Sequence, residues 1–402
     1  MRRTGSADLP LHGGRVPYWL ASRMEKLGGA IAESIIEEYG REVFLNRICD
    51  PAWFQAFGCI LGMDWHSSGI TTSVMGALRR SFERRQKHLG LRVFGGRGNA
   101  SRKTPAELKS FAALKGLDCE VLVRSSKLSA KVDNTAIQDG YQLYLHCFLV
   151  DEKGDWAVVQ QGMHKNNGMA RRYHWRSTSV KDFTCQPHAA ISGIPGGPIL
   201  NLTAREAQPA KSAILKLISD KPDILRAEAR KIIMPKHHDV RASNVNLKRL
   251  GAVLALAHER PPGGFDELLL TPGLGPRTLQ SLVLVSEIIH GTPTRFEDPA
   301  RYTFAHGGKD GHPFPVPTRV YDRTIEFMDS VLQKSQMDRS EKIEALKRLH
   351  HMACRLEEDI IPDNSKFESV VRNEWKQSKR WHGMTATQER RPLKGNQLSL
   401  FA

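Results

Sequence analysis

The residues best suited to chemistry lie between positions 133 and 165, in DNTAIQDGYQLYLHCFLVDEKGDWAVVQQGMHK. This segment contains two acids, Asp133 and Asp139, and five other side chains that can bind a metal or a phosphate: His146, Gln160, Gln161, His164 and Lys165. Hydrolysis of a phosphodiester needs a divalent metal that activates water and stabilises the developing charge. We therefore predict a metal-dependent nuclease site in which Asp133 and Asp139 bind Mg²⁺ or Mn²⁺. The structural alternative is that Asp133 caps a helix and that Asp139 begins a turn.

The order of these residues resembles that of restriction-endonuclease-like nucleases. That layout has one acid on a helix, a second acid leading into a strand, and Glu or Gln on the partner strand, followed two places later by Lys. Here Gly162 and Met163 follow Gln161, so the lysine is either missing or displaced to Lys165. The resemblance implies a catalytic set of Asp133, Asp139, Gln161 and Lys165.

An antiparallel β-hairpin is expected to carry these side chains. YQLYLHCFLV and DWAVVQQGM are rich in β-branched and aromatic residues, and their connection DEKGD contains a turn-forming glycine. ARRYHW predicts a further short strand. Before this hairpin the pattern is helical, from Val16 to about Leu117, with Gly40 as a helix end and Asp50 as a helix cap. FGGRGNASRK is interpreted as a glycine-rich turn before a helix that starts at Thr104.

A second functional pattern lies at residues 265–289, FDELLLTPGLGPRTLQSLVLVSEII. Two apolar helices joined by PGLGP resemble the helix-hairpin-helix motif of many DNA repair proteins. The two glycines let the backbone approach a ligand closely, and their amides, with those at the start of the second helix, can hold a phosphate oxygen. We predict DNA binding that tolerates any sequence and weakens with salt. The alternative is a packed helical hairpin with a tight turn. The predicted DNA-binding residues are Gly273, Leu274, Gly275, Arg277 and Thr278.

The chain ends in QLSLFA after a basic, polar stretch. QLSLF resembles the pentapeptide by which bacterial polymerases and repair proteins bind the β sliding clamp. The resemblance implies that Gln397 is the polar anchor, Leu398 a lesser contact, and Leu400 with Phe401 the apolar plug. A flexible linker suits this role because the folded body can search nearby DNA while tethered. The alternative is an ending that folds back on the protein.

Two further loops carry polar clusters. GMDWHSSGITT, at residues 62–72, could bind a metal or phosphate. The favoured interpretation is structural: Ser68 caps the following helix and Trp65 packs in the core. AHGGKDGHPFPV, at residues 305–316, could line a channel, bind phosphate or form an irregular connection; its polar residues are His306, Lys309, Asp310 and His312.

Charge and composition point to a polyanionic partner. The net charge is +16, and nucleic acid is the commonest polyanion in the cytosol. The six cysteines include no C-x-x-C pair, which argues for a reducing compartment and against a structural zinc site. No apolar run reaches membrane-spanning length. We expect a cytoplasmic, nucleoid-associated protein that has DNA and the sliding clamp as partners and no membrane contact.

The predicted fold is α+β and predominantly helical, with a central β-hairpin or sheet. Its predicted domains are a helical region at 1–117, a β-containing candidate catalytic core at 118–203, a helical region at 204–375 with the helix-hairpin-helix segment, and a disordered basic tail at 376–402.

Several long stretches, among them DPAWFQAFGCILGMDWHSSGITTSVMGAL, DNTAIQDGYQLYLH and DPARYTFAHGGKDGHPFPV, resemble domain-of-unknown-function family 763 of bacteria and archaea. The resemblance runs from about Thr4 to Leu349 and implies a nuclease-like role in DNA repair. Two hypotheses stay open: a metal-dependent nuclease recruited to the clamp, and a non-catalytic adaptor that couples a partner to clamp-loaded DNA.

Overall fold

The computed structural model describes residues 16, 18–63, 69–164, 168–219, 247–300, 326–333 and 343–348. The chain divides into two compact units, one of residues 1–89, 192–194 and 301–402, the other of residues 90–191 and 195–300. Helices predominate in the described residues, and the sheet pairs are antiparallel, so the predicted α+β class is confirmed.

The first unit is helical in its described part. It contains α1 (Tyr18–Tyr39), α2 (Arg41–Cys49), α3 (Pro51–Ile60) and α4 (Gly69–Leu89), and residues 326–333 and 343–348 are also helical. Gly40, with φ of 89°, separates α1 from α2 as predicted. The Asp50 carboxylate accepts hydrogen bonds from the amides of Ala52 and Trp53 at 2.9 and 3.1 Å, which confirms the predicted cap. Trp53 stacks on Phe57 in the core, with ring centroids 4.8 Å apart.

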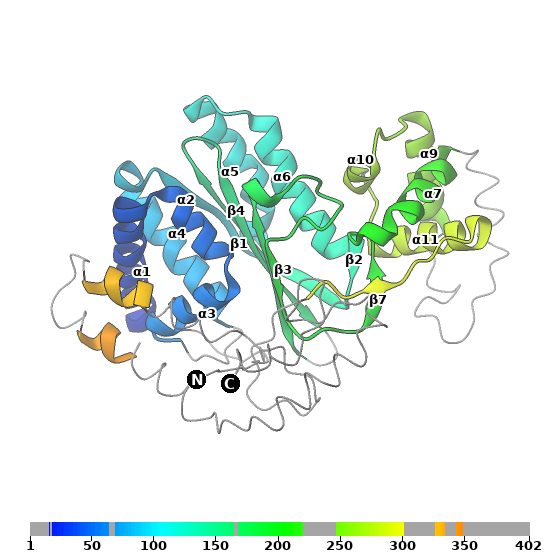
Figure 1. The fold of residues 1–402 in the computed structure, drawn as a ribbon. Coiled ribbons are helices and arrows are strands. Elements are labelled where there is room, and N and C mark those ends of the chain that lie inside the picture. Colours follow the sequence, from blue (N-terminus) through cyan, green and yellow to red (C-terminus); the bar gives the residue numbers. More distant parts are fainter. Residues whose placement is uncertain are drawn as a thin grey trace, which may run out of the picture. The chain divides into compact units, whose positions relative to one another are not determined.

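The second unit is built on a five-stranded sheet in the order β1-β3-β4-β5-β6 (Figure 1). The strands are β1 (Leu91–Arg97), β3 (Tyr141–Asp151), β4 (Trp156–His164), β5 (Ala170–Arg176) and β6 (Ala190–Ser192). The predicted hairpin is therefore confirmed as β3 and β4, and the ARRYHW strand as β5. Helices α5 (Asn99–Lys115) and α6 (Cys119–Lys131) pack against each other and share one core with the sheet, to which Phe111, Leu122 and Phe148 contribute.

The glycine-rich stretch at residues 94–103, where the sequence predicted a turn, instead forms the end of strand β1 and the start of α5, with Gly98 between them. β1 pairs antiparallel with β3, which lies about fifty residues further along the chain, so no local sequence pattern predicts this strand. Gly95 has φ of 86°, and a Cβ atom there would lie 2.2 Å from the His146 carbonyl oxygen. α5 begins at Asn99 and includes Pro105, so the predicted start at Thr104 is wrong.

In the described residues, the second unit also contains a small second sheet and four further helices. The sheet has the order β2-β7-β8, with β2 at Ile137–Gln138, β7 at Pro198–Asn201 and β8 at Phe296–Glu297. The helices are α7 (Gln208–Ser219), α9 (Leu247–Glu259), α10 (Phe265–Leu270) and α11 (Pro276–His290). A π-helical stretch at Val132–Ala136 and two 3₁₀ turns at Ser177–Ser179 and Arg205–Ala207 connect the larger elements.

Candidate functional site

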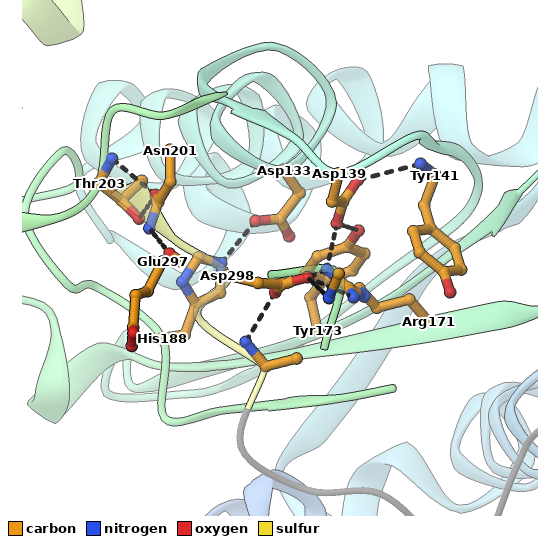
Figure 2. A network of polar contacts seen from close by, with 12 residues as sticks. Asp133, Asp139, Tyr141, Arg171, Tyr173, His188, Asn201, Thr203, Glu297 and Asp298 are labelled. Carbon is orange, nitrogen blue, oxygen red and sulfur yellow. Dashed lines mark hydrogen bonds and ion pairs between the residues drawn. The ribbon is translucent and has the colours of Figure 1, made fainter. Parts of the chain in front are cut away.

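The first predicted acid lies where α6 changes into a π-helix. π-Helical turns are rare and frequently occur at functional sites. Asp133 lies in this stretch, and its side chain is 0 % exposed. One carboxylate oxygen accepts hydrogen bonds from Gln160 Nε2 at 2.6 Å and from Trp175 Nε1 at 2.9 Å. The other oxygen lies 2.5 Å from Nε2 of His188 (Figure 2).

A buried hydrogen-bond chain continues from this acid. Gln160 Oε1 lies 2.9 Å from His146 Nδ1, and His146 Nε2 lies 2.9 Å from the Ser126 hydroxyl. Because Gln160 Oε1 only accepts, His146 donates through Nδ1 and accepts from Ser126 through Nε2. A serine that donates to histidine can act as a nucleophile with its base. Here the serine, the histidine and the glutamine are 2, 6 and 0 % exposed, so a substrate cannot reach them.

The second predicted acid belongs to a separate buried cluster. Asp139 Oδ2 accepts from Arg171 Nη1 at 2.9 Å and from the Tyr173 hydroxyl at 2.6 Å, and Oδ1 accepts from the Tyr141 amide at 3.0 Å. Arg171 also donates to both carboxylate oxygens of Asp298, at 2.9 and 2.7 Å. Figure 2 shows this one guanidinium between the two carboxylates.

Asp298 also joins two backbone segments to the cluster. It directly follows β8, and its carboxylate accepts from the amides of Gly196 at 2.7 Å and Ala300 at 2.9 Å. Its side chain is 1 % exposed. The carboxylate therefore holds the loop before β7 and the end of the unit against β5.

Burial and neighbouring charges shift the pKa values in both clusters. Burial raises the pKa of the Asp133 carboxyl, although the His188 side chain lowers it. Burial also raises the pKa of Asp139, and the Arg171 guanidinium opposes that effect. Burial works to lower the pKa of Arg171, but Asp139 and Asp298 outweigh it and raise that pKa above its ordinary value. Burial lowers the pKa of His146 to about 4, so this imidazole is neutral at neutral pH.

These donor sets do not fit a divalent metal. The oxygens of Asp133 and Asp139 face N–H and O–H donors of the protein, whereas Mg²⁺ or Mn²⁺ needs their lone pairs and several further oxygens. Within the described residues, no group of three His, Cys, Asp or Glu side chains could hold a metal. Gln160 faces Asp133, so the neighbouring Gln161 points to the opposite face of the strand. Lys165 lies outside the described residues.

Four side-chain partners of the two acids were not predicted from the sequence: Arg171, Tyr173, Trp175 and His188. Asp298, the second carboxylate bound to Arg171, was not predicted either. The first three alternate along ARRYHW, and alternate residues of a strand share a face, so this strand could have been recognised as the partner of both acids. His188 and Asp298 reach the site from distant loops, and no local pattern marks them.

The predicted DNA-binding residues form a turn between α10 and α11. Gly273 has φ of 84°, the left-handed region that favours glycine, and Leu274 is buried in the core of the unit. Gly275 precedes α11 in an extended conformation, and no side chain caps this helix. A Cβ atom at Gly275 would meet nothing within 4 Å. We call residues 271–278 the glycine hairpin.

The glycine hairpin presents amides and cations together. Within the described residues, Leu279 has the first α11 amide with a hydrogen-bond acceptor, which is the Gly275 carbonyl at 2.9 Å. The preceding amides, of Arg277 and Thr278, have no acceptor in the part of the chain that the structure describes. The Arg277 side chain is exposed, and Thr278 is 6 % exposed. Lys131 Nζ donates to the Leu274 carbonyl at 2.6 Å, which places a second positive charge at the hairpin.

Other predicted residues lie outside the described part of the chain. The cluster near residues 64–68 and the loop at 305–316 are among them. So are the four residues of the clamp-binding prediction, Gln397, Leu398, Leu400 and Phe401.

No helix in the described residues combines the length and apolar character needed to cross a bilayer.

Comparisons with known proteins place the chain in a family. A search of curated proteins and of solved structures found no significant match. The family model described as "Protein of unknown function (DUF763)" matches residues 5–316, more than half of the 402 residues, and the chain therefore belongs to the DUF763 family.

Proposed function

We propose that this protein binds the sugar–phosphate backbone of DNA, without regard to sequence, through the glycine hairpin. The observation that carries the proposal is the uncapped start of α11, where the amides of Arg277 and Thr278 have no acceptor among the described residues. Amides at a helix N-terminus, together with the helix dipole, favour an anionic oxygen. Such a contact reads no base and so is the same for every sequence.

The charges around the hairpin support the same proposal. Arg277 is exposed and makes no ion pair with the described residues, so its guanidinium is available to a phosphate. Nearby acids have partners of their own: Asp266 pairs with Arg124, and Glu267 accepts from the Gly263 amide at 2.7 Å. The net charge of +16 adds long-range attraction for a polyanion.

The enclosed acids favour the non-catalytic adaptor over the nuclease. Both carboxylates are 0 % exposed, and their oxygens accept hydrogen bonds from protein donors, so they contribute to the packing of the second unit. A nuclease that uses Mg²⁺ or Mn²⁺ at Asp133 and Asp139 would require these hydrogen bonds to open. We therefore propose an adaptor that works in DNA repair or replication in the cytoplasm, and metal-dependent cleavage is the alternative outcome of the tests below.

The proposal includes the tail. QLSLF resembles clamp-binding peptides, and Gln397, Leu398, Leu400 and Phe401 are proposed to bind a bacterial β sliding clamp. Tethering to the clamp would raise the local concentration of the glycine hairpin near DNA.

The hairpin is tested by measuring the affinity of the full chain for labelled duplexes of unrelated sequence over a series of salt concentrations. We expect Arg277→Ala to weaken binding to all duplexes alike and to lower the slope of log affinity against log salt by about 0.9, the effect of one lost phosphate contact. Arg102→Ala is the matched control, since Arg102 is also an exposed helical arginine of the second unit. An equal effect of the two substitutions would refute the hairpin contact.

Gly275→Val provides a second test of the amides. Gly275 has φ of −133°, which valine adopts readily, and its Cβ would meet open space, so folding should be retained. The added side chain would shield the start of α11 and weaken duplex binding. Unchanged affinity in a folded variant would contradict the proposal.

Cleavage and clamp docking need separate assays. Incubation of the full chain with labelled single- and double-stranded DNA, with Mg²⁺ or Mn²⁺ and then with chelator, should show no cutting if the protein is an adaptor. Metal-dependent cutting by the wild type that is lost in an Asp139→Ala variant shown to remain folded would establish the nuclease instead. Replacement of Leu400 and Phe401 by alanine should abolish clamp pull-down, and retained pull-down would refute docking through this motif.

A further inference from the structure

A pocket of about 460 Å³ lies beside the glycine hairpin, entirely within the second unit. Its size falls in the range of about 300–1,000 Å³ that is typical of small-molecule sites. The walls come from α11, from the loop and strand at 196–200, from the ends of β2 and β4, and from the segment before β8. The pocket lining includes Gln138, His164, Leu200, Gln280, Leu284 and Arg295.

Two carboxamides supply hydrogen-bonding groups to this pocket. The Gln280 side chain is half-buried and has no hydrogen-bond partner among the described residues. Gln138 Nε2 donates to the carbonyls of Thr135 and Pro276, at 3.2 and 2.8 Å. Its Oε1 accepts no hydrogen bond from the described residues. A carboxamide has a donor and an acceptor side by side, which matches the edge of a nucleobase.

The remaining walls suit a flat aromatic group. Leu200 and Leu284 are apolar, and His164 and Arg295 have planar side chains of the kind on which unstacked bases lie. The His164 ring is set edge-on to Tyr141, with centroids 5.3 Å apart. Asp139 contributes only backbone here, because its side chain is 0 % exposed.

The pocket and the glycine hairpin are connected through Gln138 and through helix α11. Gln138 lines the pocket and donates to the Pro276 carbonyl at the start of α11. Gln280 follows Arg277 by three residues, which is about 4.5 Å along the helix axis. A DNA strand with a phosphate on the α11 amides therefore has a base within reach of Gln280.

We infer that this pocket takes one unstacked base of the DNA strand held by the glycine hairpin, so that the preferred substrate is DNA with an unpaired nucleotide. The inference rests on the proposed function. A base inside a regular duplex is stacked and paired and cannot enter, whereas an unpaired base leaves the stack at low cost.

The test compares two labelled duplexes of the same sequence, one of which carries a single extra, unpaired adenine. We expect the full chain to bind the bulged duplex about tenfold more tightly, within the range that one well-placed base contact supplies. Gln280→Ala should reduce the ratio of the two affinities to near one. Gln208→Ala, the same change at an exposed glutamine of α7 that does not line the pocket, should keep the ratio.

A fluorescent base shows directly whether the pocket is filled. With 2-aminopurine as the unpaired nucleotide, binding should change its fluorescence, and Leu200→Trp, which fills the pocket, should remove that change. Equal affinity for the two duplexes, or an unchanged 2-aminopurine signal in Leu200→Trp, would overturn the inference and leave the proposed function standing. Failure to bind either duplex would overturn both.

Discussion

Replacement of Asp298 by alanine should destabilise the second unit strongly. This carboxylate accepts four hydrogen bonds, two from Arg171 at 2.9 and 2.7 Å and one each from the amides of Gly196 and Ala300. Breaking a buried ion pair costs about 3–5 kcal/mol because a charge is left uncompensated. Arg171 keeps its bond to Asp139, which reduces the loss, but the buried Ala300 amide also loses its acceptor, at about 1–3 kcal/mol. The exposed Gly196 loses its hydrogen bond as well, at a smaller cost. We expect a net loss of about 3–5 kcal/mol.

Hydrogen exchange read by mass spectrometry measures this loss locally. A change of 3–5 kcal/mol should lower the protection of amides in β5 and β7 by roughly 150- to 5,000-fold. Glu152→Ala is the matched control, because Glu152 pairs with Lys115 at the surface, where an ion pair contributes about 0–1 kcal/mol. A fall of less than about fivefold in the Asp298 variant would show that the ion pair does not hold β5 and β7 together.

Two further predictions concern burial around His146. The folded state keeps the pKa of His146 near 4, and the unfolded value is 6.5, so unfolding takes up a proton between these pH values and stability falls as the pH falls. From pH 7 to pH 5 this amounts to about 2 kcal/mol, and urea unfolding of wild type and His146→Gln should show that the variant lacks it; equal pH dependence would contradict the assignment. Gly95→Ala should cost about 2 kcal/mol or more, because its φ is 86° and the new Cβ would lie 2.2 Å from the His146 carbonyl oxygen. Gly116→Ala, with φ of 67° and open space, should cost only about 1 kcal/mol by thermal unfolding, and equal costs would show that the close contact is relieved.

Local patterns predicted the elements whose signals are contained within a short window. The cap at Asp50, the helix end at Gly40 and the hairpin of β3 and β4 are all confirmed. β1 was missed because its partner strand lies far along the chain and its glycines favour a turn in the local pattern. The family resemblance, carried by long stretches rather than single motifs, is confirmed over residues 5–316.

The two acids of the candidate site could be predicted from the sequence, but the groups that bind their carboxylates could not. The sequence showed acids at 133 and 139 beside strands, and the structure places both on the same face of β5. One Asp133 oxygen faces His188, and the Arg171 guanidinium that binds Asp139 also binds Asp298. No local pattern shows these contacts, because His188 and Asp298 lie far along the chain from the two acids. Because side chains alternate along a strand, Gln160 faces Asp133 and the predicted Gln161 does not. A shift of one residue in the strand would exchange the two side chains.

The spacing of the two acids has a structural reason in the residues that lie beside them. Lys131 donates to the Leu274 carbonyl, and Gln138 donates to the Pro276 carbonyl. Both ends of the segment 131–139 therefore contact the glycine hairpin. Asp133 and Asp139 fix this segment to β5 through Trp175, Arg171 and Tyr173. Buried, hydrogen-bonded carboxylates resist displacement, since moving either one leaves buried donors without a partner. The acids that resemble a nuclease site thus anchor the support of the glycine hairpin to the central sheet, and the proposed phosphate contact at the hairpin amides requires no metal at the carboxylates.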